Sequence, residues 1–265
     1  MANTSYNAPA ARNAIIIVER LCQSETPIGV REICRQTGLN PNMVFRLLKT
    51  LEDVNWIVAY EGGTKYAMSL RPFHFTSKTA ANMSFARAAT GPLHELWEKT
   101  GESCYAGIRD VTRTLFLEHL DASGDIKIAA KPGGRFLMHC AAPGKVLLAY
   151  SSREQVLDVI SVEGLPAQTP NTITGKKALF EELAKIKKQG FAIDREEYAG
   201  GLICFAAPVF DHRDQLAGTI GLSALTLNYS LKRMINELGP HVLHAAGKAS
   251  TNLGSIRPGE AKDKA

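Results

Sequence analysis

The sequence predicts an α+β protein with two domains: a small three-helix domain carrying a β-hairpin, then a larger domain of antiparallel strands and helices. Helical stripes of apolar residues dominate the first 53 residues, and two short β-rich runs then flank a glycine-rich turn at residues 61–64. From Ser103 onward, longer β-rich runs are interspersed with helical segments. With 265 residues, 45% of them hydrophobic, the chain can bury a core in each domain.

Two short amphipathic helices joined by a tight turn are predicted at residues 30–51. Gly38 supplies the left-handed residue that ends the first of them, near residue 36. Asn40 can cap the second helix, and Pro41 suits its first position because proline has no amide to leave unpaired. Along the second helix, apolar residues recur at i, i+3, i+4 and i+7 and predict one buried stripe: Val44, Leu47, Leu48 and Leu51.

The opposite face of this helix is free to make contacts outside the domain. Its amide and guanidinium groups suit base edges and phosphates in a DNA major groove about 12 Å wide. The pair is therefore interpreted as a helix-turn-helix, with Arg46 as the first candidate for DNA contact. The predicted contacts are Arg31, Asn42, Met43, Phe45, Arg46, Lys49, Thr50 and, on the hairpin, Lys65.

The rest of the first domain completes a winged helix at residues 9–70. An earlier helix buries a stripe made of Ala14, Ile17, Val18 and Leu21. Strands are predicted at residues 57–60 and 65–68, and their hairpin is interpreted as the wing. A linker helix is expected over residues 71–84.

Charge and cysteine content exclude several classes of protein. The net charge is +5, and residues 1–77 hold eight Lys or Arg against six Asp or Glu, a difference of +2, so the pattern rather than the total favours DNA. Five scattered cysteines without a C-x-x-C pair indicate neither a disulfide framework nor structural zinc. There is no apolar run of 18 residues and no secretory leader pattern, which predicts a cytoplasmic protein. Residues 1–8 and 253–265 are polar without periodicity and are expected to be disordered.

The second domain is predicted over residues 85–252. Its first helix buries Ala89, Leu93, Leu96 and Trp97 and ends at Gly101. Strands follow at residues 103–110 and 112–120, with another at 127–130. A helix that buries Leu179, Leu183 and Ile186 is expected to start at the N-cap Thr174 and to stop at Gly190. Strands at residues 191–194, 202–210 and 215–225 and a final helix from about Ser230 complete an antiparallel α+β domain.

Three segments in order, EICRQTGLNPNMVFRLLKTL, FLMHCAAPGKVLLAY and GFAIDREEYAGGLICFAAPVFD, give the chain a family resemblance. Over residues 10–250 it resembles the IclR family of bacterial transcription regulators. The resemblance implies an N-terminal winged helix, a linker helix and a GAF-like effector-binding domain, in dimers or tetramers that bind palindromic operators. This sequence departs from the family at Asn42 and Met43, where members commonly carry a small hydroxyl residue, so the operator sequence is left open.

The resemblance also implies an effector pocket formed by Phe136, Ala142, Pro143, Asp194, Cys204, Gly221 and Ser223. A loop of small residues that leads into a helix near Ala142 exposes amides that favour a carboxylate. Ser223 can donate a hydrogen bond, whereas an ionised Asp194 would repel an anion unless it accepts from hydroxyl groups or is protonated. A small organic acid carrying hydroxyl groups, such as a sugar acid, satisfies both conditions. Each residue also has a plain structural interpretation, such as a buried small side chain for Cys204.

Three alternatives compete with a DNA-binding regulator. An enzyme is disfavoured because GLSAL lacks the second glycine of a nucleophile elbow and APGKV lacks the Ser or Thr of a phosphate loop. A metal site at His139 and Cys140, helped by Cys204 and His119, is disfavoured because adjacent strand residues point to opposite faces. A ligand-sensing scaffold whose winged helix binds a protein partner stays open. The sequence thus predicts no catalytic residue, metal or cofactor.

Overall fold

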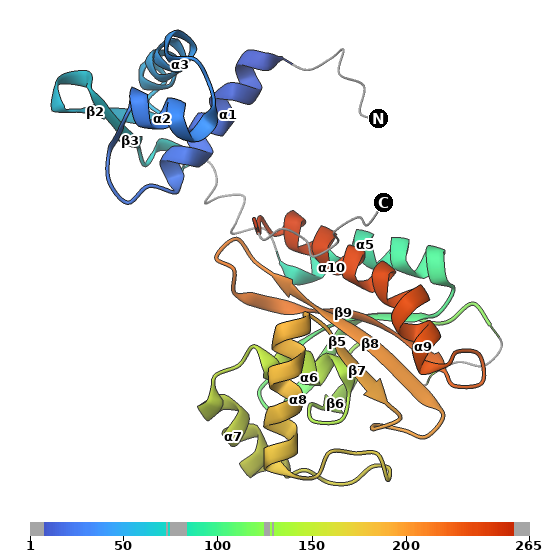
Figure 1. Ribbon diagram of the computed structural model, residues 1–265. Helices are drawn as coiled ribbons and strands as arrows, with labels where there is room; N and C mark the ends of the chain where they lie inside the picture. The colour runs from blue at the N-terminus through green and yellow to red at the C-terminus, as the bar shows by residue number, and fades with distance from the viewer. Residues whose placement is uncertain (1–7, 73, 75–83, 125–127, 129, 257–265) are drawn as a thin grey trace. The chain divides into compact units, whose positions relative to one another are not determined.

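The computed structural model describes residues 8–72, 74, 84–124, 128 and 130–256 of the chain. The chain divides between Asn82 and Met83 into two compact units, described separately below (Figure 1). Among the described residues, no helix is both long and apolar enough to cross a membrane. The predicted α+β class, with a winged helix before an antiparallel sheet, is confirmed.

The N-terminal unit contains the three predicted helices: α1 (Pro9–Cys22), α2 (Val30–Thr37) and α3 (Pro41–Asp53). Gly38 ends α2 in the left-handed conformation (φ 73°), as predicted. The Asn40 side chain caps α3 by accepting from the amide of Met43 at 2.9 Å. The apolar stripes of the helices meet in one core that contains Ile17, Leu21, Ile33, Val44, Leu48 and Leu51.

A three-stranded antiparallel sheet in the order β1-β3-β2 flanks these helices. The wing is formed by β2 (Ile57–Tyr60) and β3 (Lys65–Met68), as predicted, with a short 3₁₀ helix, η2 (Glu61–Gly63), between them. Gly62 and Gly63 both adopt positive φ, which explains why the turn is rich in glycine. Strand β1 (Ile28–Gly29), which the sequence did not predict, pairs with β3.

The predicted linker helix at residues 71–84 lies largely outside the described residues. Ser84 is described and has an extended backbone, with its side chain accepting from the amide of Arg87. The next helix, α5 (Phe85–Thr100), therefore begins with Ser84 as its N-cap, and it ends at Gly101 as predicted. Trp97 is only half-buried, contrary to the prediction, because its indole nitrogen donates to the Asp121 carbonyl at 2.6 Å near the surface.

The C-terminal unit is built on one antiparallel sheet in the order β6-β5-β4-β9-β8-β7. Its strands are β4 (Ser103–Asp110), β5 (Arg113–Leu120), β6 (Arg135–Leu137), β7 (Ala192–Arg195), β8 (Leu202–Phe210) and β9 (Leu216–Leu225). The sequence placed a strand at residues 127–130, but Ile128 and Ala130 are not in a strand, and residues 127 and 129 lie outside the described part. The strand in this region is β6, which begins after the turn around Gly133 and Gly134.

Helices cover both faces of this sheet (Figure 1). Helices α5 and α10 (Gly239–Asn252) pack on one face, around Phe205 and Leu222. Helices α6 (Ala142–Ala149), α7 (Arg153–Glu163) and α8 (Lys176–Gln189) belong to the core on the other face, around Tyr105 and Cys204. We call this second side the α6/α8 face. Between β9 and α10 lie the short α9 (Leu231–Arg233) and a π-helical turn, η3 (Met234–Leu238).

Three local features differ from the sequence expectations. The N-cap of α8 is Gly175 rather than Thr174, and no side chain caps that end. His139 and Cys140 lie in a turn after β6, so the strand argument against a metal site does not apply to them. The packed chain extends slightly beyond residue 252, since Leu253 and Ser255 are buried and the Ser255 hydroxyl donates to Asp214 at 3.1 Å.

Candidate functional site

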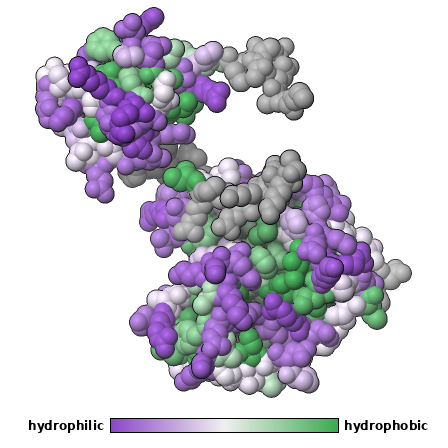
Figure 2. Space-filling model, in the orientation of Figure 1, coloured by the Kyte–Doolittle hydropathy of each residue, from purple (hydrophilic) through white to green (hydrophobic). Residues whose placement is uncertain are grey.

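The outward surface of α3 is the first candidate site. Burial of Val44 and Leu48 fixes the rotation of the helix, and five of the six α3 residues predicted to contact DNA are exposed: Asn42, Phe45, Arg46, Lys49 and Thr50. The visible side of the N-terminal unit carries mainly hydrophilic side chains (Figure 2). The helix therefore packs one apolar stripe into the domain core, with Leu47 half-buried, and leaves its other face, which includes Phe45, exposed.

The side chains on this surface are not equally available. Met43 is half-buried, and its sulfur accepts from Asn13 on α1, so it faces the neighbouring helix. Lys49 pairs with Glu52 at 2.8 Å, and the Thr50 hydroxyl donates to the Arg46 carbonyl at 3.0 Å. The Arg46 guanidinium, by contrast, has no hydrogen bond or ion pair with any residue that the structure describes. Arg46 is therefore the most available cation on α3.

The wing adds a second surface. Lys65 pairs with Glu61 at 2.8 Å, which partly neutralises its charge. Directly opposite Lys65 in the hairpin is Tyr60, whose side chain is 46% exposed, and Val58 on the same strand is 44% exposed. Sequence reasoning missed both, although the alternation in IVAY places them on the outer side of the strand. Arg31 is exposed at the start of α2, as predicted.

The second candidate site lies on the α6/α8 face and begins with a row of polar residues. Asp194 on β7 stands opposite Cys204 on β8, and Cys204 stands opposite Ser223 on β9. Paired residues of antiparallel strands share a face, so the three side chains point to the same side. The Cys204 sulfur lies 3.0 Å from the Ser223 hydroxyl oxygen. The structure thus brings together three of the seven predicted effector residues, and Ser103 on β4 extends the row.

Asp194 is completely buried, but only one of its two carboxyl oxygens has a hydrogen-bond partner among the described residues. Its Oδ1 accepts from the amides of Glu197 at 2.6 Å and Tyr198 at 3.3 Å, whereas its Oδ2 has no hydrogen-bond partner among the described residues. Burial, opposed by these hydrogen bonds, raises the pKa of Asp194 from 3.8 to about 7. A buried carboxyl oxygen without a donor is costly, and a ligand hydroxyl could supply that donor.

A buried ion network lies beside this row and was missed by sequence reasoning. The Lys145 ammonium on α6 is inaccessible to solvent and contacts Glu197 at 2.5 Å, the Ile193 carbonyl at 2.7 Å and Glu182 at 3.3 Å. Burial raises the pKa of Glu197 against the opposing effect of Lys145. The network ties α6 to β7 and to the loop that follows it.

Four aromatic rings in contact with one another form another side of this candidate site. The Tyr105 ring on β4 stacks on Phe116 with centroids 4.6 Å apart, and Phe116 lies 4.4 Å from Phe136. Phe136 in turn meets Tyr198 edge to face at 5.8 Å, which links β6 to the β7–β8 loop. Of these four rings, the sequence predicted only Phe136.

The three remaining predicted residues are buried on the same face. Gly221 lies on β9 two residues before Ser223, next to the polar row. A Cβ atom there would lie 2.4 Å from the Tyr105 hydroxyl oxygen, so Tyr105 occupies the space above Gly221. Ala142 and Pro143 begin α6 and are buried, and no side chain caps this helix end. Gly144 packs so closely on Met138 that an added Cβ would lie 2.3 Å from the Met138 Cα.

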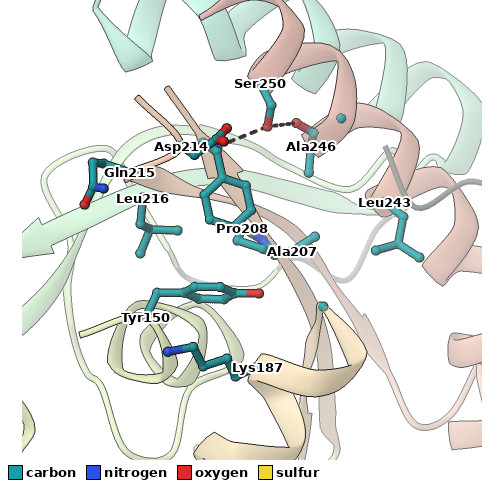
Figure 3. A pocket seen from close by; sticks show the side chains of 13 residues that line it. Tyr150, Lys187, Ala207, Pro208, Asp214, Gln215, Leu216, Leu243, Ala246 and Ser250 are labelled. Carbon is teal, nitrogen blue, oxygen red and sulfur yellow. Dashed lines mark hydrogen bonds between the residues drawn. The ribbon is translucent and has the colours of Figure 1, made fainter. Parts of the chain in front are cut away.

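A separate cavity of about 520 Å³ opens elsewhere on the C-terminal unit (Figure 3). Tyr150 and Lys187 lie on one side of it, and Ala246 and Ser250 of α10 lie on the other. Pro208 of β8 forms part of the wall between them. None of the seven predicted effector residues lines this cavity. It therefore offers a second place at which ligand binding must be tested.

Within the described part of the chain, no cluster of three or more His, Cys, Asp or Glu side chains is arranged to hold a metal ion. His139 is buried, and its Nε2 lies 3.1 Å from the Pro166 carbonyl, while desolvation lowers its pKa. Cys140 is also buried, and burial raises its thiol pKa to about 12, which keeps it protonated.

Comparison with known proteins identifies the architecture. A family model for the IclR helix-turn-helix domain matches residues 10–59, and one for the bacterial transcriptional regulator IclR C-terminal domain matches residues 77–251. The chain belongs to the IclR family. It is a DNA-binding transcription regulator of IclR type, a family of regulators rather than enzymes, as predicted.

Individual relatives agree along nearly the whole chain. The HTH-type transcriptional regulator KdgR of Escherichia coli is 27% identical over 259 residues, which cover 96% of this chain and 98% of KdgR. The transcriptional repressor IclR of Escherichia coli is 27% identical over 248 residues, covering 91% of this chain and 88% of that protein. The crystal structure of the Agobacterium tumefaciens repressor BlcR superposes with a TM-score of 0.80 at 19% identity, covering 95% of this chain and 99% of BlcR. This last similarity concerns the fold.

Proposed function

We propose that this IclR-type regulator binds a palindromic operator as a homodimer or homotetramer, and that a small hydroxylated organic acid controls its binding. The observation that carries the DNA-binding mode is the exposed surface of α3 opposite an apolar stripe in which Val44, Leu48 and Leu51 are buried and Leu47 is half-buried. Such a helix can lie in the major groove with its N-terminal side chains on base edges. A two-fold symmetric oligomer would present two of these helices to two half-sites.

Arg46 and Asn42 are the residues we assign to base edges, and Arg31 and Lys65 to phosphates. Arg46 has no described protein partner that must be given up on binding. Lys49 and Lys65 each exchange a carboxylate for a phosphate, which reduces their net contribution. We therefore expect Arg46 to dominate among the cations of this surface.

The DNA-binding mode is tested with fragments selected from a genomic library by the full-length protein. Arg46→Ala should lower affinity about tenfold or more and reduce the salt dependence, since one charged contact is lost. Arg213→Ala is the matched control, because it removes an exposed arginine from the other unit. Equal affinities of the two variants would contradict the proposal. Binding that does not change with salt would contradict it as well.

The effector is proposed to bind the polar row on the α6/α8 face. Among the residues that the structure describes, none donates to the buried Asp194 Oδ2 with hydrogen-bond geometry, and the Ser223 hydroxyl lies on the same face one strand beyond Cys204. A hydroxyl group of the ligand can donate to Asp194, while Ser223 can donate to its carboxylate. Because the pKa of Asp194 is about 7, a protonated fraction also exists near neutral pH and reduces the repulsion of an anion.

Calorimetry with matched pairs of hydroxylated and unsubstituted acids tests this site. Asp194→Asn and Ser223→Ala should each weaken binding of the hydroxylated acid, and Asp194→Asn should reduce the preference for it. Gly247→Leu is the control, because Gly247 lines the separate cavity and a side chain there would fill it. If Gly247→Leu abolishes binding and the other two variants do not, the effector binds in the cavity and our assignment is wrong.

Control of DNA binding follows if the acid binds one arrangement of the oligomer better than another. The preferred arrangement would set the spacing of the two recognition helices and hence their fit to the half-sites. An acid that bound both arrangements equally would not regulate, however tightly it bound. Operator affinity measured with and without saturating acid gives this coupling directly.

A further inference from the structure

The Tyr105 side chain lies directly beside the polar row of the proposed effector site. Tyr105 stands opposite Gly221, which in turn stands opposite Ala206 on β8 and is followed by Ser223 two residues on. Ala206 stands opposite Ala192 on β7. Three small buried residues thus lie next to the polar row on the α6/α8 face, and the Tyr105 phenol covers Gly221.

The fit between the phenol and Gly221 is close. A Cβ atom on Gly221 would lie 2.4 Å from the Tyr105 hydroxyl oxygen and 2.6 Å from its Cζ, so only glycine leaves room for the ring. Tyr105 is 1% exposed, and its ring stacks on Phe116 with an interplanar angle of 7°. Stacking on one side and the sheet on the other hold the ring in place.

The hydroxyl group of Tyr105 is poorly used by the protein itself. It donates to the Phe205 carbonyl oxygen at 3.4 Å, which is long for a hydroxyl donor. Burial raises the pKa of this hydroxyl well above its ordinary value, and the neighbouring Cys204 and Asp194 raise it further. A neutral hydroxyl donor therefore borders the polar row and can turn to a better acceptor.

We propose that Tyr105 limits the length of the acid that the effector site admits and donates a hydrogen bond to that acid. This inference rests on the proposed effector site at Asp194 and Ser223. A ligand held by those two side chains that extends past Ser223 toward Gly221 meets the phenol there. A short hydroxy acid ends before the ring, whereas the long chain of a sugar acid meets it, so we expect the site to select the shorter members of the proposed class.

The test measures binding of 2-hydroxy acids of increasing chain length, from glycolate and lactate to 2-hydroxyhexanoate, to the full-length protein by calorimetry. The wild-type protein should prefer the short acids. Tyr105→Leu should bind the longer acids about tenfold tighter than the wild type, the effect of about two newly buried methylene groups, and the short acids more weakly. Tyr105→Phe should retain the length preference but bind all acids several-fold more weakly, because only the hydroxyl donor is lost.

Phe191→Leu is the matched control, because it removes an aromatic ring that stacks on Phe205 in the core on the other side of the sheet. It should leave the length profile unchanged. Tyr105→Met, whose flexible side chain fills irregular space, replaces Tyr105→Leu if the latter does not fold. The preference of the wild-type protein for short acids can be measured whether or not any variant folds.

Several results would overturn the inference. A wild-type protein that binds 2-hydroxyhexanoate tighter than glycolate or lactate contradicts it. So does a Tyr105→Leu or Tyr105→Met protein that folds and keeps the wild-type length profile while Asp194→Asn still weakens binding, and in that case the effector site stands. If neither Asp194→Asn nor Ser223→Ala affects binding, or if no acid of the series binds, the proposed site or ligand class is itself wrong.

Discussion

Replacement of Asp194 by asparagine should change how the stability of the C-terminal unit depends on pH. The folded-state pKa of Asp194, about 7, lies above its ordinary value of 3.8 because the carboxyl is buried and stands near the charge of Glu197. Between these two values the folded protein holds a proton that the unfolded chain has released. The free energy of unfolding contributed by this group therefore falls as pH rises from about 4 to about 7 and is constant above about pH 8.

The magnitude follows from the two pKa values. A difference of about 3 units at about 1.36 kcal/mol per unit gives a total loss of about 4 kcal/mol, of which about 2–3 kcal/mol falls between pH 5 and pH 8. Asp194→Asn removes the titration and keeps an oxygen that can accept from the amides of Glu197 and Tyr198. Relative to the wild type, the variant should become more stable by about 2–3 kcal/mol on going from pH 5 to pH 8.

Urea unfolding followed by tryptophan fluorescence can measure this difference. The chain has two tryptophans, so a Trp56→Phe background leaves Trp97 on α5 as the reporter of the C-terminal unit. Ser223→Ala is the control, because it alters a residue of the same row without removing the titrating carboxyl. Parallel pH profiles for Asp194→Asn and the wild type would show that Asp194 is already ionised at pH 5 in the folded state, and the argument would fail.

Two further substitutions test local packing through the midpoint of unfolding. Gly144→Ala should destabilise the protein by about 1–3 kcal/mol or more, because the new methyl group meets the Met138 backbone at 2.3 Å, whereas Gly247→Ala on α10 meets nothing within 4 Å and should stabilise it by about 0.5–1 kcal/mol. Equal effects of the two would contradict the packing described here. Asn40→Ala removes the cap of α3 and should cost the N-terminal unit about 1 kcal/mol, measured with Trp56 fluorescence. An unchanged midpoint would mean that solvent replaces the cap without loss.

Elements defined by local sequence were predicted well. The apolar period of α3, the Asn40 cap and the Gly38 stop are all properties of neighbouring residues, so one stretch of chain contains the information for the helix and its exposed face. The error at Thr174 is of the same local kind: two residues before the helix can serve as its cap, and the chain enters from Gly175. The β6 strand was misplaced because a three-residue edge strand gives almost no periodic signal.

The candidate site depends on register, which local patterns do not contain. Asp194, Cys204 and Ser223 were assigned through the family resemblance, and their alignment across three strands became visible only from the strand pairing. Tyr105 was missed because its role comes from standing opposite Gly221, more than a hundred residues away along the chain. A tyrosine inside a strand otherwise indicates no more than a buried ring.

The small-residue loop before α6 was interpreted as an anion site built from backbone amides, but the structure adds a cation that changes this argument. Lys145 places a solvent-inaccessible ammonium against Glu197 and the Ile193 carbonyl, and its charge opposes the burial that raises the pKa of Asp194. Asp194 Oδ1 accepts a hydrogen bond from the backbone amide of the same Glu197. A ligand at Asp194 Oδ2 would therefore stand beside a charged network that also holds the β7–β8 loop, rather than beside backbone amides alone.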